Sequence, residues 1–238
     1  LRSIGVTGPM LRFITALYAD SVMKLRLPDG SLSDPFRLQR GVRQGCPLSP
    51  ILFNLFIDTL FDDWEDDAGN SLGVEISGVG GLVPGFMFAD DVVALAAGPI
   101  QLEHVLRRIS AWSDKWHMQT NAGKCGIMVF SPYANSDCDG FYDRLVTKIR
   151  ASKELHWLQG QALSIVERYT YLGCVIDRQL SLKTMIGDRA EKGRRALMGL
   201  RPFLCNRSIP LEVRAMVFKG VVLPTVLYGA ELWGGSAT

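Results

Sequence analysis

The stretch GFMFADDVVAL, residues 85–95, decides how the rest of the chain is interpreted. Apolar residues flank two adjacent carboxylates, Asp90 and Asp91, a pattern that predicts two strands joined by a two-residue Asp-Asp turn. Such turns ordinarily contain Asn-Gly or another glycine pair, because their central residues need positive φ. Two like charges at a strained turn favour a bound cation, and carboxylate oxygens suit a pair of Mg²⁺ ions that assist phosphoryl transfer. A solvated hairpin tip is the alternative.

Three further stretches accompany this one in chain order. RGVRQGCPLSP occupies residues 40–50, NAGKC occupies residues 121–125, and YLG occupies residues 171–173. The ordered set resembles the palm of reverse transcriptases, in particular those of non-LTR (LINE-like) retrotransposons. In that family the four stretches correspond to motif B, motif C, motif D and the primer-grip motif E. Group II intron maturases and telomerases share the palm, but the motif wording here is closer to LINE-like enzymes.

The resemblance implies catalytic roles for three residues. Asp90 and Asp91 would hold two Mg²⁺ ions, for which Mn²⁺ can substitute, with Asp90 the more direct ligand. Lys124 would act as a cation or an acid near the leaving pyrophosphate. A surface lysine at the start of a strand is the alternative for Lys124.

The resemblance also implies binding roles on either side of the carboxylates. Gln44 and Gly45 would form a loop under the incoming nucleotide and template base, where glycine lets backbone approach the substrate. The neighbouring Arg40 and Arg43 are expected to be exposed and to contact phosphate. A plain turn before a helix is the alternative for Gln44-Gly45. The primer grip would consist of Tyr171, Leu172 and Gly173, for which an ordinary buried strand is the alternative.

One part of the family pattern is missing. A third catalytic carboxylate, in motif A, should precede motif B, but none of Asp20, Asp29 and Asp34 is followed by the motif's aromatic-Asp pair. Asp29 marks a hairpin tip, and residues 58–62 fall after motif B on a solvated helix face. We therefore expect a fragment that begins just after motif A and is inactive alone. A catalytically dead remnant or a non-enzymatic RNA-binding module is the alternative.

Composition is that of an ordinary globular chain. Its 238 residues, 47% of them hydrophobic, can bury a sizeable core in one domain or two. We find no membrane-spanning segment and no signal peptide. The five cysteines are scattered, which predicts reduced thiols, no structural zinc and an intracellular location, without distinguishing nucleus from cytoplasm.

Charge is distributed unevenly although the net charge is only +2. Residues 44–106 contain ten acidic residues and no lysine or arginine, whereas residues 177–238 contain ten basic and five acidic residues. A basic lobe that follows phosphates beside an acidic lobe that concentrates cations fits a polymerase. An exposed helix face is the alternative for residues 189–195. The implied partners are an RNA template, a DNA primer, dNTPs and neighbouring domains of a parent polyprotein.

Local patterns predict an α+β fold. Helices are expected over residues 8–23, 50–64, 99–116 and from 182 onwards. The second should be capped by Ser49, and because it is apolar on nearly every side it should be a central buried helix. Strands are expected over residues 124–130, 155–158, 163–166 and 169–176, and an irregular surface segment over residues 131–154. We thus predict a palm, an antiparallel sheet with packed helices and part of the fingers, over residues 1–176. A helical thumb-like region is expected over residues 177–238.

Overall fold

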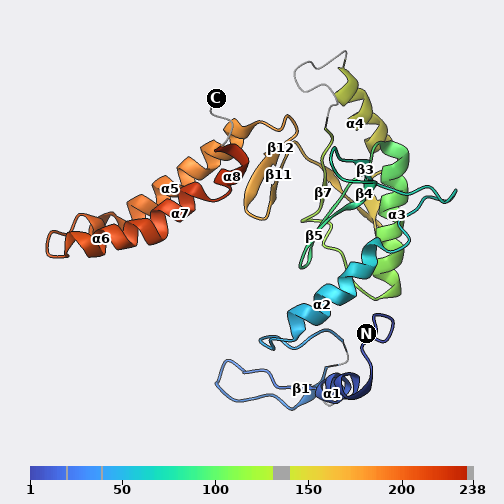
Figure 1. Cartoon of the computed structure of the whole chain (residues 1–238), viewed down its shortest axis with the longest axis horizontal. Coiled ribbons are helices and arrows are strands. Elements are labelled where there is room, and N and C mark those ends of the chain that lie inside the picture. The colour runs from blue at the N-terminus through green and yellow to red at the C-terminus, as the bar shows by residue number, and fades with distance from the viewer. Residues whose placement is uncertain (20, 39, 131–139, 235–238) are drawn as a thin grey trace. The chain divides into compact units, whose positions relative to one another are not determined.

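The structure, a computed structural model, describes residues 1–19, 21–38, 40–130 and 140–234 (Figure 1). It contains two compact units, Leu1–Ala97 and Gly98–Thr238, and each combines helices with short strand pairs. The expected α+β mixture of helices and strands is therefore confirmed, but the described strands form separate pairs, one of them parallel, and not the single antiparallel sheet that was expected. None of the described helices is both long and apolar enough to cross a bilayer.

The first unit contains helices α1 (Gly8–Ala19) and α2 (Ser49–Ile57), followed by the 3₁₀ turn η1 (Asp58–Phe61). Its antiparallel strand pairs are β1 (Val22–Met23) with β2 (Phe36–Arg37), β3 (Val74–Glu75) with β4 (Leu82–Val83), and β5 (Gly85–Phe88) with β6 (Asp91–Ala94). Asp29 lies at the tip of the first hairpin, as predicted. The Ser31 hydroxyl and backbone N–H donate to its carboxylate at 2.7 Å and 2.9 Å, which lowers the pKa of Asp29.

The prediction of a buried, Ser49-capped helix over residues 50–64 is wrong. Helix α2 ends at Ile57, and Ile51 is 57% exposed, because its apolar surface extends around more faces than neighbouring elements cover. Ser49 is the first helical residue and not the cap. Its hydroxyl donates to the Arg43 carbonyl at 2.6 Å and is therefore engaged with the preceding loop. Pro50 does lie in the first turn, as predicted.

The second unit begins with helices α3 (Pro99–Lys115) and α4 (Phe141–Ala151). Its strand pairs are β7 (Gly126–Ile127) parallel to β10 (Ser164–Ile165), β8 (Trp157–Leu158) antiparallel to β9 (Gln161–Ala162), and β11 (Arg168–Tyr171) antiparallel to β12 (Cys174–Asp177). The chain continues as α5 (Leu182–Leu204), α6 (Leu211–Val217), the π-helical η3 (Phe218–Val222), α7 (Leu223–Leu227) and α8 (Ala230–Trp233). The predicted helix over residues 99–116 and the helical C-terminal region are confirmed.

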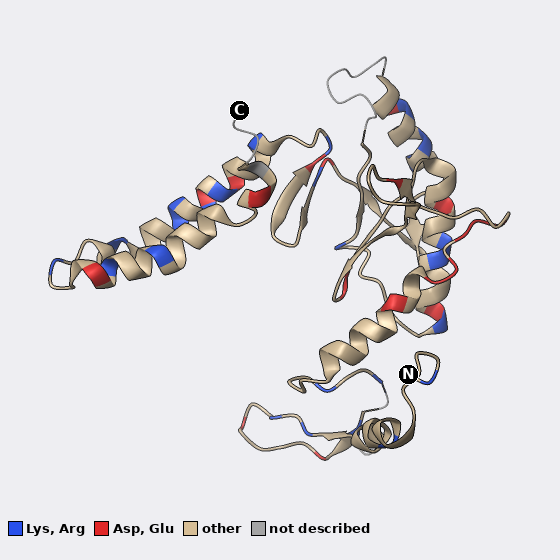
Figure 2. Cartoon of the chain, viewed as in Figure 1, with Lys and Arg blue, Asp and Glu red and all other residues tan. Residues whose placement is uncertain are grey.

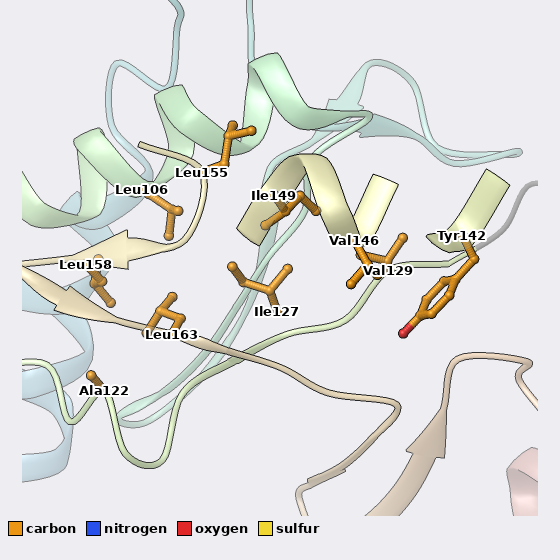
Figure 3. Close-up of a cluster of buried hydrophobic side chains, with 10 residues drawn as sticks. All are labelled: Leu106, Ala122, Ile127, Val129, Tyr142, Val146, Ile149, Leu155, Leu158 and Leu163. Atoms are coloured by element: carbon orange, nitrogen blue, oxygen red, sulfur yellow. The ribbon is translucent and has the colours of Figure 1, made fainter. Parts of the chain in front are cut away.

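A cluster of buried apolar side chains forms the core of the second unit (Figure 3). Helix α4 contributes Tyr142, Val146 and Ile149, whose spacing places them on one helix face. This helix contradicts the irregular surface segment expected over residues 131–154, of which residues 131–139 lie outside the described part. The prediction failed because charged residues between the three apolar positions made the segment look uniformly polar.

Helix α5 packs against α7 as a helical hairpin (Figure 1). Gly193 makes this approach possible, because a Cβ at that position would overlap the Val226 side chain. Helix α5 carries lysine and arginine residues along its length and two acidic residues, Asp188 and Glu191, in its first half (Figure 2). Arg194 and Arg195 are exposed and donate to Glu191 at 2.9 Å and 3.0 Å; these two hydrogen bonds, that from Arg194 first, lower the pKa of Glu191 to about 2.

Candidate active site

The acidic hairpin forms, but its turn is one residue earlier than predicted. Phe88 pairs with Asp91, so the turn consists of Ala89 and Asp90, and Asp91 is the first residue of β6. The positive φ falls on Ala89, at 53°. A hairpin turn of this kind needs positive φ at its first central position only, so neither aspartate adopts it. The prediction of an Asp-Asp turn is therefore wrong in register.

The base of this hairpin rests on η1. A Cβ at Gly85 would overlap the Val93 carbonyl oxygen and would lie 2.8 Å from Cζ of Phe61, so only glycine permits this contact. The Phe61 ring in turn packs edge-on against Trp64, with centroids 4.9 Å apart, and Trp64 is buried. The aromatic pair supports the hairpin from the side opposite Phe88, because side chains alternate between the two faces of a strand.

The tip of the hairpin is open. Asp90 and Asp91 are both exposed, and neither carboxylate hydrogen-bonds or forms an ion pair with a residue that the structure describes. Phe86 and Phe88, on the same face as Asp91, are 50% and 63% exposed. Within the described ranges, no group of three His, Cys, Asp or Glu side chains has metal-binding geometry. The tip therefore offers two carboxylates as oxygen ligands.

The loop before α2 is held by a polar network. Arg43 donates from Nε to the Ser21 hydroxyl at 3.0 Å, and its Cζ lies 5.9 Å from the Tyr18 ring centroid. The Tyr18 hydroxyl lies 3.1 Å from the Ser49 hydroxyl, which itself donates to the Arg43 carbonyl. Arg43 is thus half-buried, and the expectation that it is exposed is wrong, because these contacts hold it against α1. Arg40 is exposed, as expected.

Gln44 and Gly45 form the central residues of a tight turn in this loop. The Cys46 N–H donates to the Arg43 carbonyl at 3.3 Å, and Gly45 has φ of 80°. Positive φ at the third turn position defines a type II turn and favours glycine. Both central residues are exposed. The backbone N–H of Leu48 is the main cause of the lowered pKa of the Cys46 thiol.

Lys124 lies in the turn before β7 and not at the start of a longer strand as predicted. Its backbone N–H donates to the Asn121 carbonyl at 2.9 Å, and its side chain is exposed. The Lys124 carbonyl accepts a hydrogen bond from the Tyr169 hydroxyl at 2.7 Å. This bond connects Lys124 to β11, two residues before the Tyr171–Gly173 stretch.

The stretch Tyr171–Gly173 is a hairpin turn, which contradicts the strand expected over residues 169–176. Tyr171 pairs with Cys174, and the central residues Leu172 and Gly173 have φ of 47° and 79°, as a type I′ turn requires. The strand prediction failed because Leu172 is apolar, and apolar residues rarely occupy such a turn. Leu172 and Gly173 are exposed, whereas Tyr171 is half-buried.

Two residues outside the predicted site, Tyr228 and Arg189, contact this turn. The Tyr228 hydroxyl donates to the Leu172 carbonyl at 2.7 Å, and Arg189 donates to the Gly173 carbonyl. The Arg189 Cζ lies 4.5 Å from the Tyr228 ring centroid, and only 6% of Arg189 is exposed. The alternative considered for residues 189–195, an exposed helix face, is therefore wrong for Arg189. Its four-residue spacing from Met185 and Gly193, which are also buried, is the signal that could have revealed it.

The predicted site residues fall into two groups. Asp90, Asp91 and the loop of residues 40–45 belong to the first unit, whereas Lys124 and the turn of residues 171–173 belong to the second. In the first unit, none of the described hydrogen bonds, ion pairs or ring contacts joins the loop to the carboxylates. In the second, the Tyr169 hydrogen bond joins Lys124 to the hairpin that carries the turn.

Comparison with known proteins gives the family. Residues 6–176 match the family model described as reverse transcriptase (RNA-dependent DNA polymerase). The chain is 27% identical over 220 residues to the RNA-directed DNA polymerase from mobile element jockey of Drosophila funebris, covering 88% of this chain and 21% of that protein.

The chain also matches Pol polyproteins of the retrotransposable element R2. The R2 polyprotein of Popillia japonica is 30% identical over 126 residues, which cover 52% of this chain and 17% of that protein. The R2 polyprotein of Nasonia vitripennis is 38% identical over 96 residues, which cover 40% of this chain and 9% of that protein. The chain thus spans about a fifth or less of the length of these relatives. The resemblance inferred from the motifs is confirmed, and the chain belongs to the reverse transcriptase family as a domain of the non-LTR retrotransposon kind.

Proposed function

We propose that this chain is the palm and thumb of an RNA-directed DNA polymerase that extends a DNA primer on an RNA template. The observation that carries this proposal is the pair of exposed carboxylates, Asp90 and Asp91, at the tip of a hairpin in a chain of this family. Residues 1–176 would form the palm with part of the fingers, and residues 177–238 the thumb.

The donors at the hairpin tip fit Mg²⁺ in chemical type. Carboxylate oxygens are the ligands that this cation prefers, and the carboxylates of Asp90 and Asp91 have no partner among the described residues. A pair of Mg²⁺ ions, with Mn²⁺ as a substitute, would stabilise the attacking and leaving oxygens of nucleotidyl transfer. Two carboxylates are fewer than a two-metal site uses, so a third ligand would come from sequence other than the four motifs.

The loop of residues 40–45 would receive the incoming nucleotide. Arg40 and Arg43 both line a pocket of about 100 Å³, which is large enough for a phosphate group but not for a whole nucleotide. The Gln44-Gly45 turn is exposed and lets the backbone approach a base closely. Arg43 is already hydrogen-bonded through Nε, so its remaining donors would contact the phosphate.

In the second unit, Lys124 would assist departure of pyrophosphate, and the turn of residues 171–173 would hold the primer terminus. The exposed Lys124 side chain and exposed Leu172-Gly173 turn are consistent with these roles. We further infer an intracellular protein that works beside other domains of a longer polyprotein. Its substrates would be dNTPs, the RNA template and the DNA primer.

The test is Mg²⁺-dependent extension of a DNA primer on an RNA template. The chain is assayed alone and together with any native sequence that flanks it, beside the Asp90→Asn variant of each. Asp62→Asn is the matched control, because Asp62 is also exposed and its carboxylate has no partner among the described residues. Extension that is lost in Asp90→Asn and kept in Asp62→Asn supports the proposal.

The outcome that opposes the proposal is a folded protein that binds RNA and extends no primer in either form. That result would favour a catalytically dead remnant or a non-enzymatic RNA-binding module. Equal extension by wild type and Asp90→Asn would instead remove the acidic hairpin from the mechanism.

A further inference from the structure

The Leu172-Gly173 turn is held at both of its carbonyl groups by residues far away in the chain. Tyr228, just after α7, donates its hydroxyl proton to the Leu172 carbonyl at 2.7 Å. Arg189, on α5, donates to the Gly173 carbonyl. A turn that needed only hairpin geometry would have the Tyr171–Cys174 pairing alone. The additional contacts fix the orientation of the peptide groups within the turn.

The direction of one peptide group follows from this geometry. Described peptide bonds are all trans, so the N–H of Gly173 points opposite to the Leu172 carbonyl. Because that carbonyl faces the Tyr228 hydroxyl, the Gly173 N–H faces away from Tyr228, and no described residue accepts its hydrogen. Gly173 is exposed. The turn therefore presents one oriented backbone donor to whatever lies outside it.

Arg189 and Tyr228 form a stacked pair that contacts the turn. The guanidinium stacks on the Tyr228 ring at 4.5 Å, and Arg189 is 94% buried. Among the described residues no carboxylate pairs with Arg189, and its Nε has no hydrogen-bond partner. The Gly173 carbonyl is thus the polar group that Arg189 serves. A Cβ at Gly173 would lie 3.5 Å from Tyr228 and 3.6 Å from Arg189, in ordinary van der Waals contact with both side chains.

We propose that Tyr228 and Arg189 are positioning residues, which fix the Leu172–Gly173 peptide so that the Gly173 N–H donates to a phosphate of the primer strand. This inference rests on the proposed function, which assigns primer binding to this turn. A backbone donor held in place before binding costs little ordering on association, so loosening it should weaken primer binding more than it slows chemistry.

The test uses variants that remove one contact each. Tyr228→Phe removes the hydroxyl and keeps the ring, Arg189→Lys keeps the charge, and Arg189→Met removes the donor. The matched control is Tyr142→Phe, because Tyr142 also has a guanidinium over its ring, that of Arg178 at 4.0 Å, but lies in the core. Thermal unfolding of each variant checks that it is folded.

The readout is the Kd of a primer–template duplex, measured by fluorescence anisotropy, with KM and kcat for extension. For Tyr228→Phe we expect Kd and KM of the duplex to rise about 3- to 10-fold, the effect of one hydrogen bond, while kcat and the KM for dNTP change less than about twofold. Arg189→Met should also raise the Kd and KM of the duplex, and the values for Arg189→Lys should lie between those of Arg189→Met and wild type. Tyr142→Phe should match wild type.

Primers that carry one neutral methylphosphonate identify the phosphate that accepts the hydrogen bond. At one linkage the substitution should weaken wild-type binding, and it should weaken Tyr228→Phe binding less, because the donor is already misplaced. The inference would be overturned if Tyr228→Phe bound the duplex with the wild-type Kd. It would also be overturned if the methylphosphonate weakened binding of Tyr228→Phe as much as binding of wild type at every linkage. If the protein extends no primer but the methylphosphonate effect on binding is still smaller in Tyr228→Phe, the result would count against the proposed polymerase activity alone. If the wild type does not bind the duplex, the result would count against both proposals.

Discussion

The turn at Ala89-Asp90 and the turn at Leu172-Gly173 both begin with a non-glycine residue at positive φ, 53° and 47° respectively. They differ in what holds them. The first turn is supported from below through Gly85, and its carboxylates have no described partner. The second turn has both carbonyls bound, by Tyr228 and Arg189. One turn therefore offers side chains to a ligand, whereas the other offers a backbone whose orientation is set by distant residues.

The largest expected effect tests this division between side chain and backbone. Asp90→Asn should lower the extension rate by about 10²-fold or more, the scale of losing one electrostatic contact to developing charge. Leu172→Ala in the other turn should change the rate less than about tenfold, because it leaves the turn backbone in place. Single-turnover extension measures both.

If Leu172→Ala lowered the extension rate as much as Asp90→Asn does, the distinction between the two turns would be wrong. The Leu172 side chain would then matter as much as the Asp90 carboxylate. Denaturant unfolding accompanies the assay. Asp90→Asn should leave the free energy of unfolding within about 0.5 kcal/mol of wild type, as expected of an exposed side chain without partners.

The next prediction concerns the support of each turn. Gly85→Ala should destabilise the chain by about 2–3 kcal/mol, because its Cβ would overlap the Val93 carbonyl and contact Phe61 at 2.8 Å. Gly173→Ala should cost about 1 kcal/mol, because its surroundings leave ordinary van der Waals contact and only the φ of 79° is unfavourable. Urea unfolding gives both values.

Gly187→Ala serves as the control for these glycine variants. Gly187 lies in α5 with open space around it, so alanine should stabilise the helix by roughly 0.5–1 kcal/mol. If Gly173→Ala proved more damaging than Gly85→Ala, the second turn would be the more tightly packed of the two. The contrast between a turn supported by packing and a turn held by hydrogen bonds would then be wrong.

Protonation of Asp177 should weaken the attachment of the β11–β12 hairpin to α5. Asp177, which ends β12, accepts hydrogen bonds from the Thr184 hydroxyl at 2.5 Å and from the Ser181 and Gln179 N–H groups. These bonds, that of Thr184 first, lower the pKa of Asp177 in the folded state. A lowered pKa contributes stability above the ordinary value of 3.8 that is lost as pH falls through the lowered value.

The measurement compares wild type with Asp177→Asn by urea unfolding at pH 7 and near pH 3. The stability difference between them should be larger at pH 7 and should shrink at pH 3. Thr184→Val, which removes the leading cause, should be intermediate in its pH dependence. A difference that stays constant with pH would show that Asp177 acts through its hydrogen-bond geometry and not through its charge.

The two turns also show which structural features could be predicted from the sequence and which could not. The Asp90-Asp91 pair was recognisable because its chemistry lies in side chains, and only its register was predicted wrongly. The register depends on which residue adopts positive φ, and hydrophobic alternation does not reveal that Ala89 does so. The Leu172-Gly173 turn was predicted as strand, because the local sequence is apolar and the contacts that shape it come from residues 189 and 228.

The same reasoning applies to the helices. Helix α3 was predicted well because its apolar face repeats over 17 residues. Helix α4 was missed because its three buried residues are separated by charges. Arg43 was expected to be exposed, and its contacts with Tyr18 and Ser21 depend on α1 packing beside the loop, which the sequence does not encode locally. Family membership was evident because four short motifs occur in order.

The smallest expected effect is the most direct test of the shared backbone strain. Ala89→Gly should relieve the cost of an L-residue in the left-handed region, about 1–2 kcal/mol, against about 0.5–1 kcal/mol of added unfolded-state entropy. A net stabilisation of roughly 0.5 kcal/mol is therefore expected. Leu172→Gly has the same two terms but also removes a side chain that lines the cavity beside α5 and α8, so its net effect should be near zero or unfavourable.

Paired urea titrations of the two glycine variants, with Gly187→Ala as reference, resolve differences of this size when the m-values agree. Equal stabilisation of both would mean that the Leu172 side chain contributes nothing to the second turn, whose conformation would then depend on Tyr228 and Arg189 alone. Stabilisation of Leu172→Gly but not of Ala89→Gly would mean that the acidic turn is not strained. Its aspartates would then be positioned by the hairpin register and by the support under Gly85, without any cost at Ala89.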